Sequence, residues 1–247
     1  AAHASTLAFE MTSGRRPVIV NCGHGAPFGP DWARAGRATA SHSTLALEGF
    51  SSSRLGKGDA LADRAQVTAA RVPGARAAGA AEGHGITLGH DGWSVTHGLT
   101  HVRALDLSAD GRVLSGEDTL GAVTGAERGR FDQVMSALRL QGVRFAIRFH
   151  LHPDVEAGLD MGGTAVSLAL RSGEIWVFRH DGAAEMTLEP SVYLERGRLR
   201  PRAARQIVLS GVIADYAFTA GWTLAKAQDT PLAVRDLERD DPFAPED

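Results

Sequence analysis

This sequence of 247 residues has only one cysteine, and it lacks long apolar runs and an excess of basic charge. The single cysteine, Cys22, excludes an internal disulfide framework and a cysteine-based zinc knuckle. No apolar run approaches the roughly 20 residues that cross a bilayer, so no membrane partner is expected. The formal charge is -3, with 26 basic residues scattered among 29 acidic ones. This balance leaves no electrostatic footprint for nucleic-acid binding.

Several motifs of common enzyme classes are also missing. No glycine-rich phosphate loop follows a strand, which excludes the nucleotide-dependent classes, and no G-x-S-x-G elbow supports a serine nucleophile. The first residues, "AAHASTLAFE", have neither an initiator methionine nor the basic and apolar regions of a signal peptide. We therefore expect the chain to have been cut out of, or matured from, a longer protein.

Short β-like runs separated by turn dipeptides dominate what is present. Tight turns are predicted at Ser13-Gly14, Asp110-Gly111, Ser172-Gly173 and Asp181-Gly182, where glycine supplies a positive φ. Each is expected to close a hairpin, and the hydrophobic content of 43% is enough for a sizeable core. The pattern predicts an all-β fold, an antiparallel β-sandwich in one domain over residues 1–235.

One segment follows a helical period instead. Phe131, Val134, Met135 and Leu138 recur at helix spacing, which predicts a short helical insertion near residues 126–140 that ends at Gly142. Residues 51–85 are expected to be a long exposed excursion with at most one strand, around residues 66–72. The charged tail, residues 236–247, is expected to be frayed.

The densest histidine pattern is "RFHLHPDV", which holds His150, His152 and Asp154. On a strand these side chains would share one face and could bind zinc or manganese. Pro153 interrupts the alternation, however, and the other interpretation is a strand whose opposite face packs in the core, with Phe149 among its residues. His150 and His152 would then face a groove or solvent.

Two further groups combine histidine with other polar residues. His97 and His101, with Arg103, are predicted to line a sheet groove that could bind an anion, together with His150 and His152.

The second group, His3, Asn21 and His42, is dispersed along the chain. Its members would meet at one end of the sheet if His3 begins a strand, Asn21 ends its partner and His42 enters from the next strand. The alternative is an asparagine in a turn and two unrelated histidines at strand starts.

Ordered motifs along nearly the whole chain resemble one family. They are "HASTLAFEMTSGRRPVIVNCG", "RAGRATASHSTLALEGFSSS", "HGLTHVRALDLS", "IRFHLHPDV", "GEIWVFRHDG" and "LEPSVYLE". Together they look like the C-terminal β domain of bacterial heparinase II/III-family proteins. In that family an N-terminal α/α toroid, absent from this chain, precedes a β-sandwich, and the polysaccharide lies between the two domains.

The resemblance implies a function and a location. The parent protein would be a polysaccharide lyase of the bacterial periplasm or cell envelope that cleaves uronic-acid glycans, heparin-like or related, by β-elimination. A base removes the C5 proton while other groups stabilise the developing charge. Most catalytic groups would come from the toroid, so the chain alone is expected to be inactive. The alternative is a non-catalytic carbohydrate-binding or structural module.

The resemblance also implies metal ligands. His3, Asn21 and His42 fall on or beside the family's ligand positions, which suggests zinc. Ala1 stands where the family motif has its first histidine and Ser5 replaces the motif's aspartate. Asn21 is a neutral residue at the place of a carboxylate, and an amide is a weaker zinc ligand.

Overall fold

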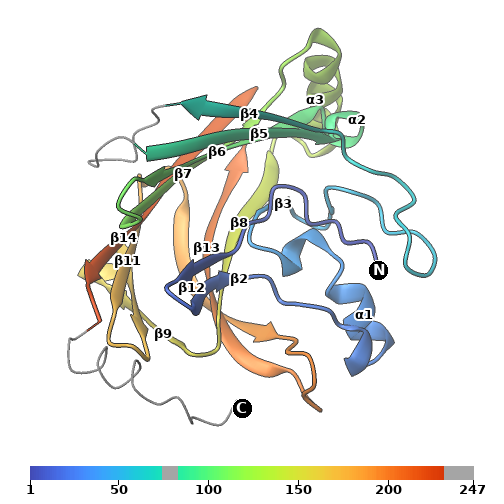
Figure 1. Ribbon diagram of the computed structural model, residues 1–247. Helices are drawn as coiled ribbons and strands as arrows, with labels where there is room; N and C mark the ends of the chain where they lie inside the picture. Colours follow the sequence, from blue (N-terminus) through green and yellow to red (C-terminus); the bar gives the residue numbers. More distant parts are fainter. Residues whose placement is uncertain (74–82, 231–247) are drawn as a thin grey trace.

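The computed structural model describes residues 1–73 and 83–230, which form two antiparallel sheets packed face to face (Figure 1). The first sheet has the order β1-β2-β8-β13-β12, and β3 also pairs with β8. Its strands are β1 (Met11–Ser13), β2 (Arg16–Val20), β3 (Leu45–Leu47), β8 (Val143–Leu151), β12 (Glu185–Tyr193) and β13 (Arg202–Ile213). The fold is the all-β sandwich that the sequence predicts.

The second sheet has the order β4-β5-β6-β7-β14-β11-β10-β9. Its strands are β4 (Val67–Pro73), β5 (Gly83–Trp93), β6 (Leu99–Ser108), β7 (Val113–Gly121), β9 (Val155–Asp160), β10 (Ala165–Leu170), β11 (Ile175–His180) and β14 (Ala217–Gln228). The helices are α1 (Pro30–Ala35), α2 (Ser94–His97) and α3 (Gly125–Ala137), with single 3-10 turns η1 (Ala26–Phe28), η2 (Thr39–Ser41) and η3 (Met161–Gly163). No helix of this described part is long and apolar enough to cross a membrane.

The core lies between the sheets and follows from strand alternation. Along β8, every second side chain from Val143 to Leu151 is buried, because successive strand residues point to opposite faces. The ring of Phe149 lies 4.8 Å from the rings of both Phe178 on β11 and Trp222 on β14. Phe9, from the segment before β1, stacks on Trp222 at 5.6 Å. The N-terminal segment is therefore part of the same core.

Three of the four predicted hairpins are confirmed, and one is wrong. The turns at Ser13-Gly14, Asp110-Gly111 and Ser172-Gly173 join the paired strands β1–β2, β6–β7 and β10–β11. The turn at Asp181-Gly182 instead leads from β11 in the second sheet to β12 in the first. The Asp181 carboxylate accepts a hydrogen bond from the Gly221 amide at 2.7 Å, which fixes this crossing.

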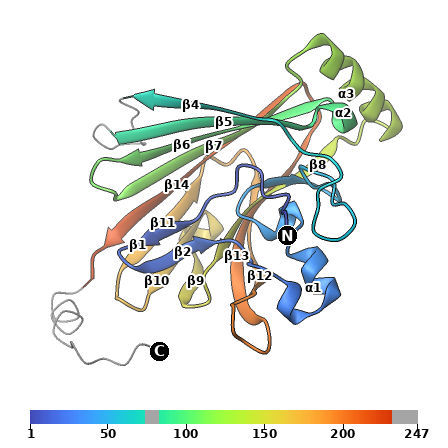
Figure 2. The same ribbon diagram turned by 45° about the vertical axis from the view of Figure 1, so that its right-hand side comes forward.

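The helical insertion is confirmed as α3, which a capping box of Thr124 and Glu127 begins. The strand predicted around residues 66–72 is confirmed as β4, which pairs with β5, whereas Ser52 and Ser53 are buried in a segment predicted to be exposed. The predicted domain end at residue 235 and the tail 236–247 lie outside the described residues. Figure 2 shows α1 and the N-terminal segment beside the first sheet, and α2 with α3 at one end of the second.

Candidate functional site

Two of the residues in the predicted metal set, His3 and His42, lie in direct contact at the N-terminal side of the domain. Nδ1 of His3 is 3.1 Å from Nε2 of His42, and Nδ1 of His42 is 2.8 Å from the Ala38 carbonyl oxygen. Since a carbonyl can only accept, His42 carries its proton on Nδ1 and its Nε2 accepts from His3. Burial lowers the pKa of His42 to about 4 and also lowers the pKa of His3. Both rings are therefore neutral near pH 7.

Asn21, the third member, follows β2 and lies beside this pair. Its Oδ1 accepts a hydrogen bond from the Ser43 amide at 2.8 Å, and its Nδ2 donates to Glu10 Oε1 at 2.9 Å. The three residues thus gather at one end of the first sheet. His3 does not begin a strand, however, since β1 starts at Met11.

A structural zinc ion requires four ligands in a tetrahedron. This cluster offers two imidazole nitrogens and an amide oxygen that already accepts a hydrogen bond. Across the described ranges, 1–73 and 83–230, no group of three or more His, Cys, Asp or Glu side chains is placed to hold a metal ion. The residues in this arrangement do not complete a zinc site, and zinc binding stays a prediction.

A basic pocket adjoins the histidine pair, and we call it the N-terminal pocket. It has a volume of about 690 Å³, and its charged lining residues are Arg34, Arg37, Arg54, Lys57 and Asp59. His24 lines it as well, with its ring 6.1 Å from that of His3. Four cations against one carboxylate make the pocket suited to an anionic ligand.

The four cations of this pocket have different roles. The guanidinium of Arg37 is buried and donates to the carbonyl oxygens of Ala2, Gly58 and Ala60, so it closes the loop around the pocket. Arg34, Arg54 and Lys57 are exposed. Their charges are therefore the ones available to a ligand.

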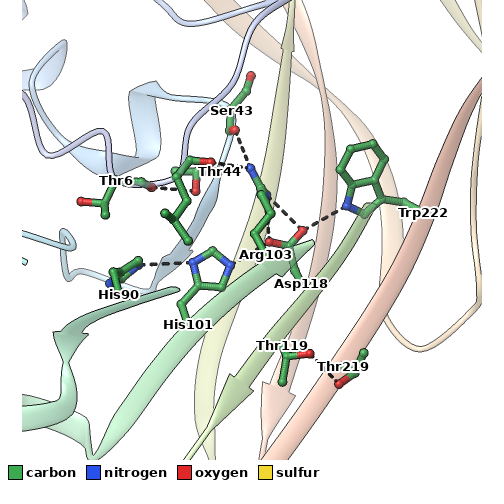
Figure 3. A network of polar contacts seen from close by, with 11 residues as sticks. Thr6, Ser43, Thr44, His90, His101, Arg103, Asp118, Thr119, Thr219 and Trp222 are labelled. Carbon is green, nitrogen blue, oxygen red and sulfur yellow. Dashed lines mark hydrogen bonds and ion pairs between the residues drawn. The ribbon is translucent and has the colours of Figure 1, made fainter. Parts of the chain in front are cut away.

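Behind this region lies a buried polar network between the sheets (Figure 3). The Gly92 amide donates to His90 Nδ1 at 3.0 Å, so the proton of neutral His90 is on Nε2, which faces His101 Nδ1 at 3.3 Å. The proton of His101 is then on Nε2, which donates to Asp118 Oδ1 at 2.7 Å. Burial lowers the pKa of His90 to about 3 and also lowers the pKa of His101, in keeping with neutral rings.

Asp118 is the centre of this network. Its carboxylate accepts two hydrogen bonds from Arg103, at 2.8 and 3.0 Å, and one from Trp222 Nε1 at 3.0 Å. Burial alone would raise the pKa of Asp118. The charge of Arg103 and the hydrogen bonds from His101 and Arg103 outweigh burial, so the net pKa is lowered and the carboxyl stays ionised.

Arg103 links this centre to the N-terminal segment. It donates to the carbonyl oxygens of Leu7 and Ser43, at 2.9 and 3.0 Å. Ser43 follows His42 in the chain and donates to Asn21. The network therefore holds the backbone that carries the histidine pair.

The prediction of a substrate groove is wrong for four of its five residues. Arg103 and His101 have no exposed surface because they bind Asp118 in the core. His150 is 3% exposed and His97, which packs against the ring of Phe50 at 4.5 Å, is 7% exposed. Their polar groups are used inside the domain, so they cannot face a polysaccharide. His152 alone keeps part of its surface exposed.

His150 and His152 have separate partners. The ring of His150 contacts Ser191 Oγ at 2.9 Å, the Ala40 carbonyl oxygen at 3.0 Å and the Cys22 sulfur at 3.5 Å. Burial raises the pKa of Cys22 to about 11, so its thiol is protonated. His152 packs against the ring of Tyr193 at 5.1 Å.

Asp154, the third polar residue of "RFHLHPDV", pairs with arginines. Its Oδ1 lies 2.8 Å from Arg202 and 2.9 Å from Arg171. The alternative interpretation of this run is therefore correct for Phe149, which packs in the core, and wrong for His150, which is buried and does not face a groove or solvent.

Sequence reasoning missed two parts of the site. Asp118 was not singled out, although it stands on the inward face of β7 opposite Arg103 on β6. The cations of the N-terminal pocket come from α1, the residues directly after it and an irregular loop, and they form no sequence motif. Only the three-dimensional arrangement brings them together.

Comparison with known proteins identifies relatives of the chain. The family model described as Heparinase II/III-like, C-terminal, matches residues 1–223. FtsZ-localized protein C of Caulobacter vibrioides (strain NA1000 / CB15N) is 30% identical over 230 residues, which cover 91% of this chain and 38% of that protein.

Solved structures share the fold. Heparan sulfate lyase HepC from Pedobacter heparinus, in a mutant form, superposes with a TM-score of 0.66 at 12% identity, over 93% of this chain and 31% of the lyase. A heparinase III structure superposes with a TM-score of 0.65 at 10% identity, over 92% of this chain and 30% of that chain. The chain thus spans well under half the length of each of these relatives.

Proposed function

The chain belongs to the family of heparinase II/III-like C-terminal domains, and on that premise we propose that it forms one wall of a binding cleft for an acidic polysaccharide in a larger lyase-type protein. The heparan sulfate lyase and heparinase III structures with the same fold support a polysaccharide-lyase-related domain. A toroid domain of the same protein would form the other wall.

The observation that carries this proposal is the N-terminal pocket. Three exposed cations, Arg34, Arg54 and Lys57, surround a cavity of about 690 Å³. Guanidinium groups bind carboxylates and sulfates through paired, charge-assisted hydrogen bonds. Uronic acids and sulfated sugars offer these groups at regular intervals, so an acidic glycan matches the pocket better than a neutral one.

The histidine pair next to this pocket does not line it and adds no positive charge to it. His3 and His42 are neutral near pH 7, because burial lowers the pKa of both rings. We assign no catalytic group to this chain, and we propose that the base for β-elimination comes from the preceding domain. The isolated chain is then inactive on heparin, alginate and chondroitin. Appearance of unsaturated uronate absorbance with this chain alone would contradict that assignment.

The binding proposal is tested with defined heparin oligosaccharides and the full chain. Arg34→Gln together with Arg54→Gln is expected to weaken binding at least about tenfold, equivalent to about 1.4 kcal/mol. The matched control, Arg139→Gln together with Arg179→Gln, removes the same charge from exposed positions that do not line the pocket. Equal affinities of the two double variants would reject the N-terminal pocket as the glycan site.

Zinc at His3 and His42 is a separate part of the proposal. The two facing nitrogens, 3.1 Å apart, share a hydrogen bond in this structure, so zinc would have to replace that bond and would need further ligands. Bound zinc would hold the N-terminal segment against η2. Metal analysis of the purified chain tests this: zinc at background level, with no rise in melting temperature on adding zinc, would rule it out.

A second candidate function rests on the relative from Caulobacter. FtsZ-localized protein C is 30% identical to this chain, whereas the two lyase structures are 12% and 10% identical. Its name states that FtsZ localizes it. We therefore also propose a non-catalytic module in a protein positioned by FtsZ. Pull-down of purified FtsZ by the chain, without binding of acidic glycans, would favour this candidate.

A further inference from the structure

The outer face of the first sheet carries another cavity, which we call the sheet pocket. It has a volume of about 610 Å³ and shares no lining residue with the N-terminal pocket. Its floor is one row of small side chains across three strands: Ala46 on β3, Ala146 on β8 and Ser210 on β13. Small residues here leave space above the sheet, and the ring of Phe50 closes one side.

Arg148 projects into this pocket from β8. Its backbone amide donates to the Thr44 carbonyl oxygen at 3.0 Å, which fixes its place in the sheet. Its side chain lines the pocket and is half-buried, and no hydrogen bond or ion pair joins it to another residue that the structure describes. Its nitrogens are not among the described side-chain atoms that are buried without a partner, so the five N–H donors of this guanidinium are open to a ligand that enters the pocket.

Burial lowers the pKa of Arg148, and the charge of Glu189 acts in the opposite direction. An acceptor from outside the chain would relieve this desolvation. A carboxylate matches the fork of a guanidinium, since its two oxygens can take two parallel hydrogen bonds. A ligand that binds Arg148 would therefore be expected to carry a carboxylate at that end.

The opposite wall of the sheet pocket is acidic. Glu185 and Glu189 stand on β12, in rows on either side of the row that contains Arg148. Strand β13 separates β12 from β8, so the two walls are about 10 Å apart along the sheet. Glu189 is held by the Thr187 hydroxyl at 2.8 Å, and Glu185 is exposed.

The charges of the pocket select among ligand classes. At the rim, Arg144 and Glu48 lie 3.7 Å apart and cancel. Arg148 then stands against two carboxylates, so a simple anion meets net repulsion. A ligand that carries a carboxylate at one end and a cation at the other satisfies both walls. A chain of methylene groups between them would cover the floor of small residues and the edge of Phe50.

We propose that the sheet pocket binds a basic amino acid, either free or as the last residue of a short peptide. Its carboxylate lies on Arg148, and its side-chain cation lies at Glu185 and Glu189. This assignment is independent of the glycan proposal, because the two pockets are separate.

The test is isothermal titration calorimetry of the full chain with four probes that share the straight side chain of lysine and differ in their charged ends. L-lysine and glycyl-L-lysine carry both charged ends, L-lysinamide lacks the carboxylate, and L-norleucine lacks the side-chain amine. Lysine or the dipeptide is expected to bind at least about tenfold more tightly than lysinamide or norleucine. The tighter binder of L-lysine and glycyl-L-lysine shows whether the ligand is the free amino acid or the last residue of a peptide.

Two variants test which residue binds each end of the ligand. Arg148→Gln should remove the preference for lysine over lysinamide, and Glu185→Gln should weaken the preference for lysine over norleucine. Glu185 is exposed, so this second variant is expected to fold even if Arg148→Gln does not. Arg179→Gln and Glu117→Gln, on the second sheet, are matched controls that should bind like the parent chain.

Three outcomes would overturn the proposal. They are no saturable binding of lysine or the dipeptide at millimolar concentration, equal binding of all four probes, and tighter binding of D-glucuronate than of lysine. The last would assign the sheet pocket to an acidic sugar.

Discussion

Asp118 is the central acceptor of the buried polar network. It stands on β7 and accepts hydrogen bonds from His101 and Arg103 on β6 and from Trp222 on β14. Through Arg103 it also holds the carbonyl oxygens of Leu7 and Ser43. One carboxylate therefore compensates a buried cation and ties the N-terminal segment to the second sheet.

Replacing Asp118 with asparagine keeps the shape and removes the charge. Arg103 would then be a buried guanidinium without a counter-ion, and breaking such a pair typically costs about 3–5 kcal/mol. Urea unfolding of Asp118→Asn should show a loss of this size in the free energy of unfolding. Glu117→Gln, an exposed neighbour on the same strand, should change it by less than about 0.5 kcal/mol. A similar, small effect of both changes would mean that the network does not stabilise the fold.

At the residue scale, the sequence predicts which residues come together better than it predicts which residues are buried. It brings His3, Asn21 and His42 to one end of the sheet, where the structure has them, through the family motifs. It places Arg103 in a groove, because Arg103 follows His97 and His101 on a β-like run that could bind an anion. The reason for the error is Asp118, a buried partner whose position is set by strand register and is not visible in a local motif.

At the element scale, local signals specify turns and helices but not sheet membership. Helix α3 combines apolar residues at helical spacing with a capping box, and both signals are local. The predicted helix ends at Gly142, whereas α3 ends at Ala137. Asp181-Gly182 forms a turn, but the strands on its two sides do not pair with each other: β11 pairs with β10 and β14, and β12 pairs with β13. Pairing depends on the long-range core, so the dipeptide alone could not reveal the crossing.

The capping box gives an element-scale prediction. The Thr124 hydroxyl accepts a hydrogen bond from the Glu127 amide, and the Glu127 carboxylate accepts one from the Thr124 amide at 2.8 Å. Thr124→Ala removes the first of these bonds and should lower the free energy of unfolding by about 1 kcal/mol. Thr124→Ser keeps the hydroxyl and serves as the control. If urea midpoints of both variants equal that of the parent chain, the cap contributes nothing to stability.

At the scale of the whole molecule, buried neutral histidines are distributed over every part of the fold. His42 lies in the N-terminal segment, His90 on the second sheet and His150 on the first. Burial lowers the pKa of all three, to about 4, about 3 and about 4. Each ring is neutral in the folded state and hydrogen-bonded to a fixed partner, so protonation disrupts the segment, the second sheet and the first sheet together.

This distribution predicts a strong pH dependence of stability. In the unfolded chain these histidines titrate near 6.5, while the folded state takes up their protons only near pH 4 and below. The unfolded state therefore binds more protons in this window, and stability is full above pH 6.5 and falls as pH drops toward 4. Each histidine adds a slope of about 1.4 kcal/mol per pH unit in the steepest part of the window. Urea unfolding followed from neutral pH to pH 4.5 should show this fall, and His90→Gln should reduce its slope. A free energy of unfolding that is constant over this range would show that the buried rings do not control acid stability.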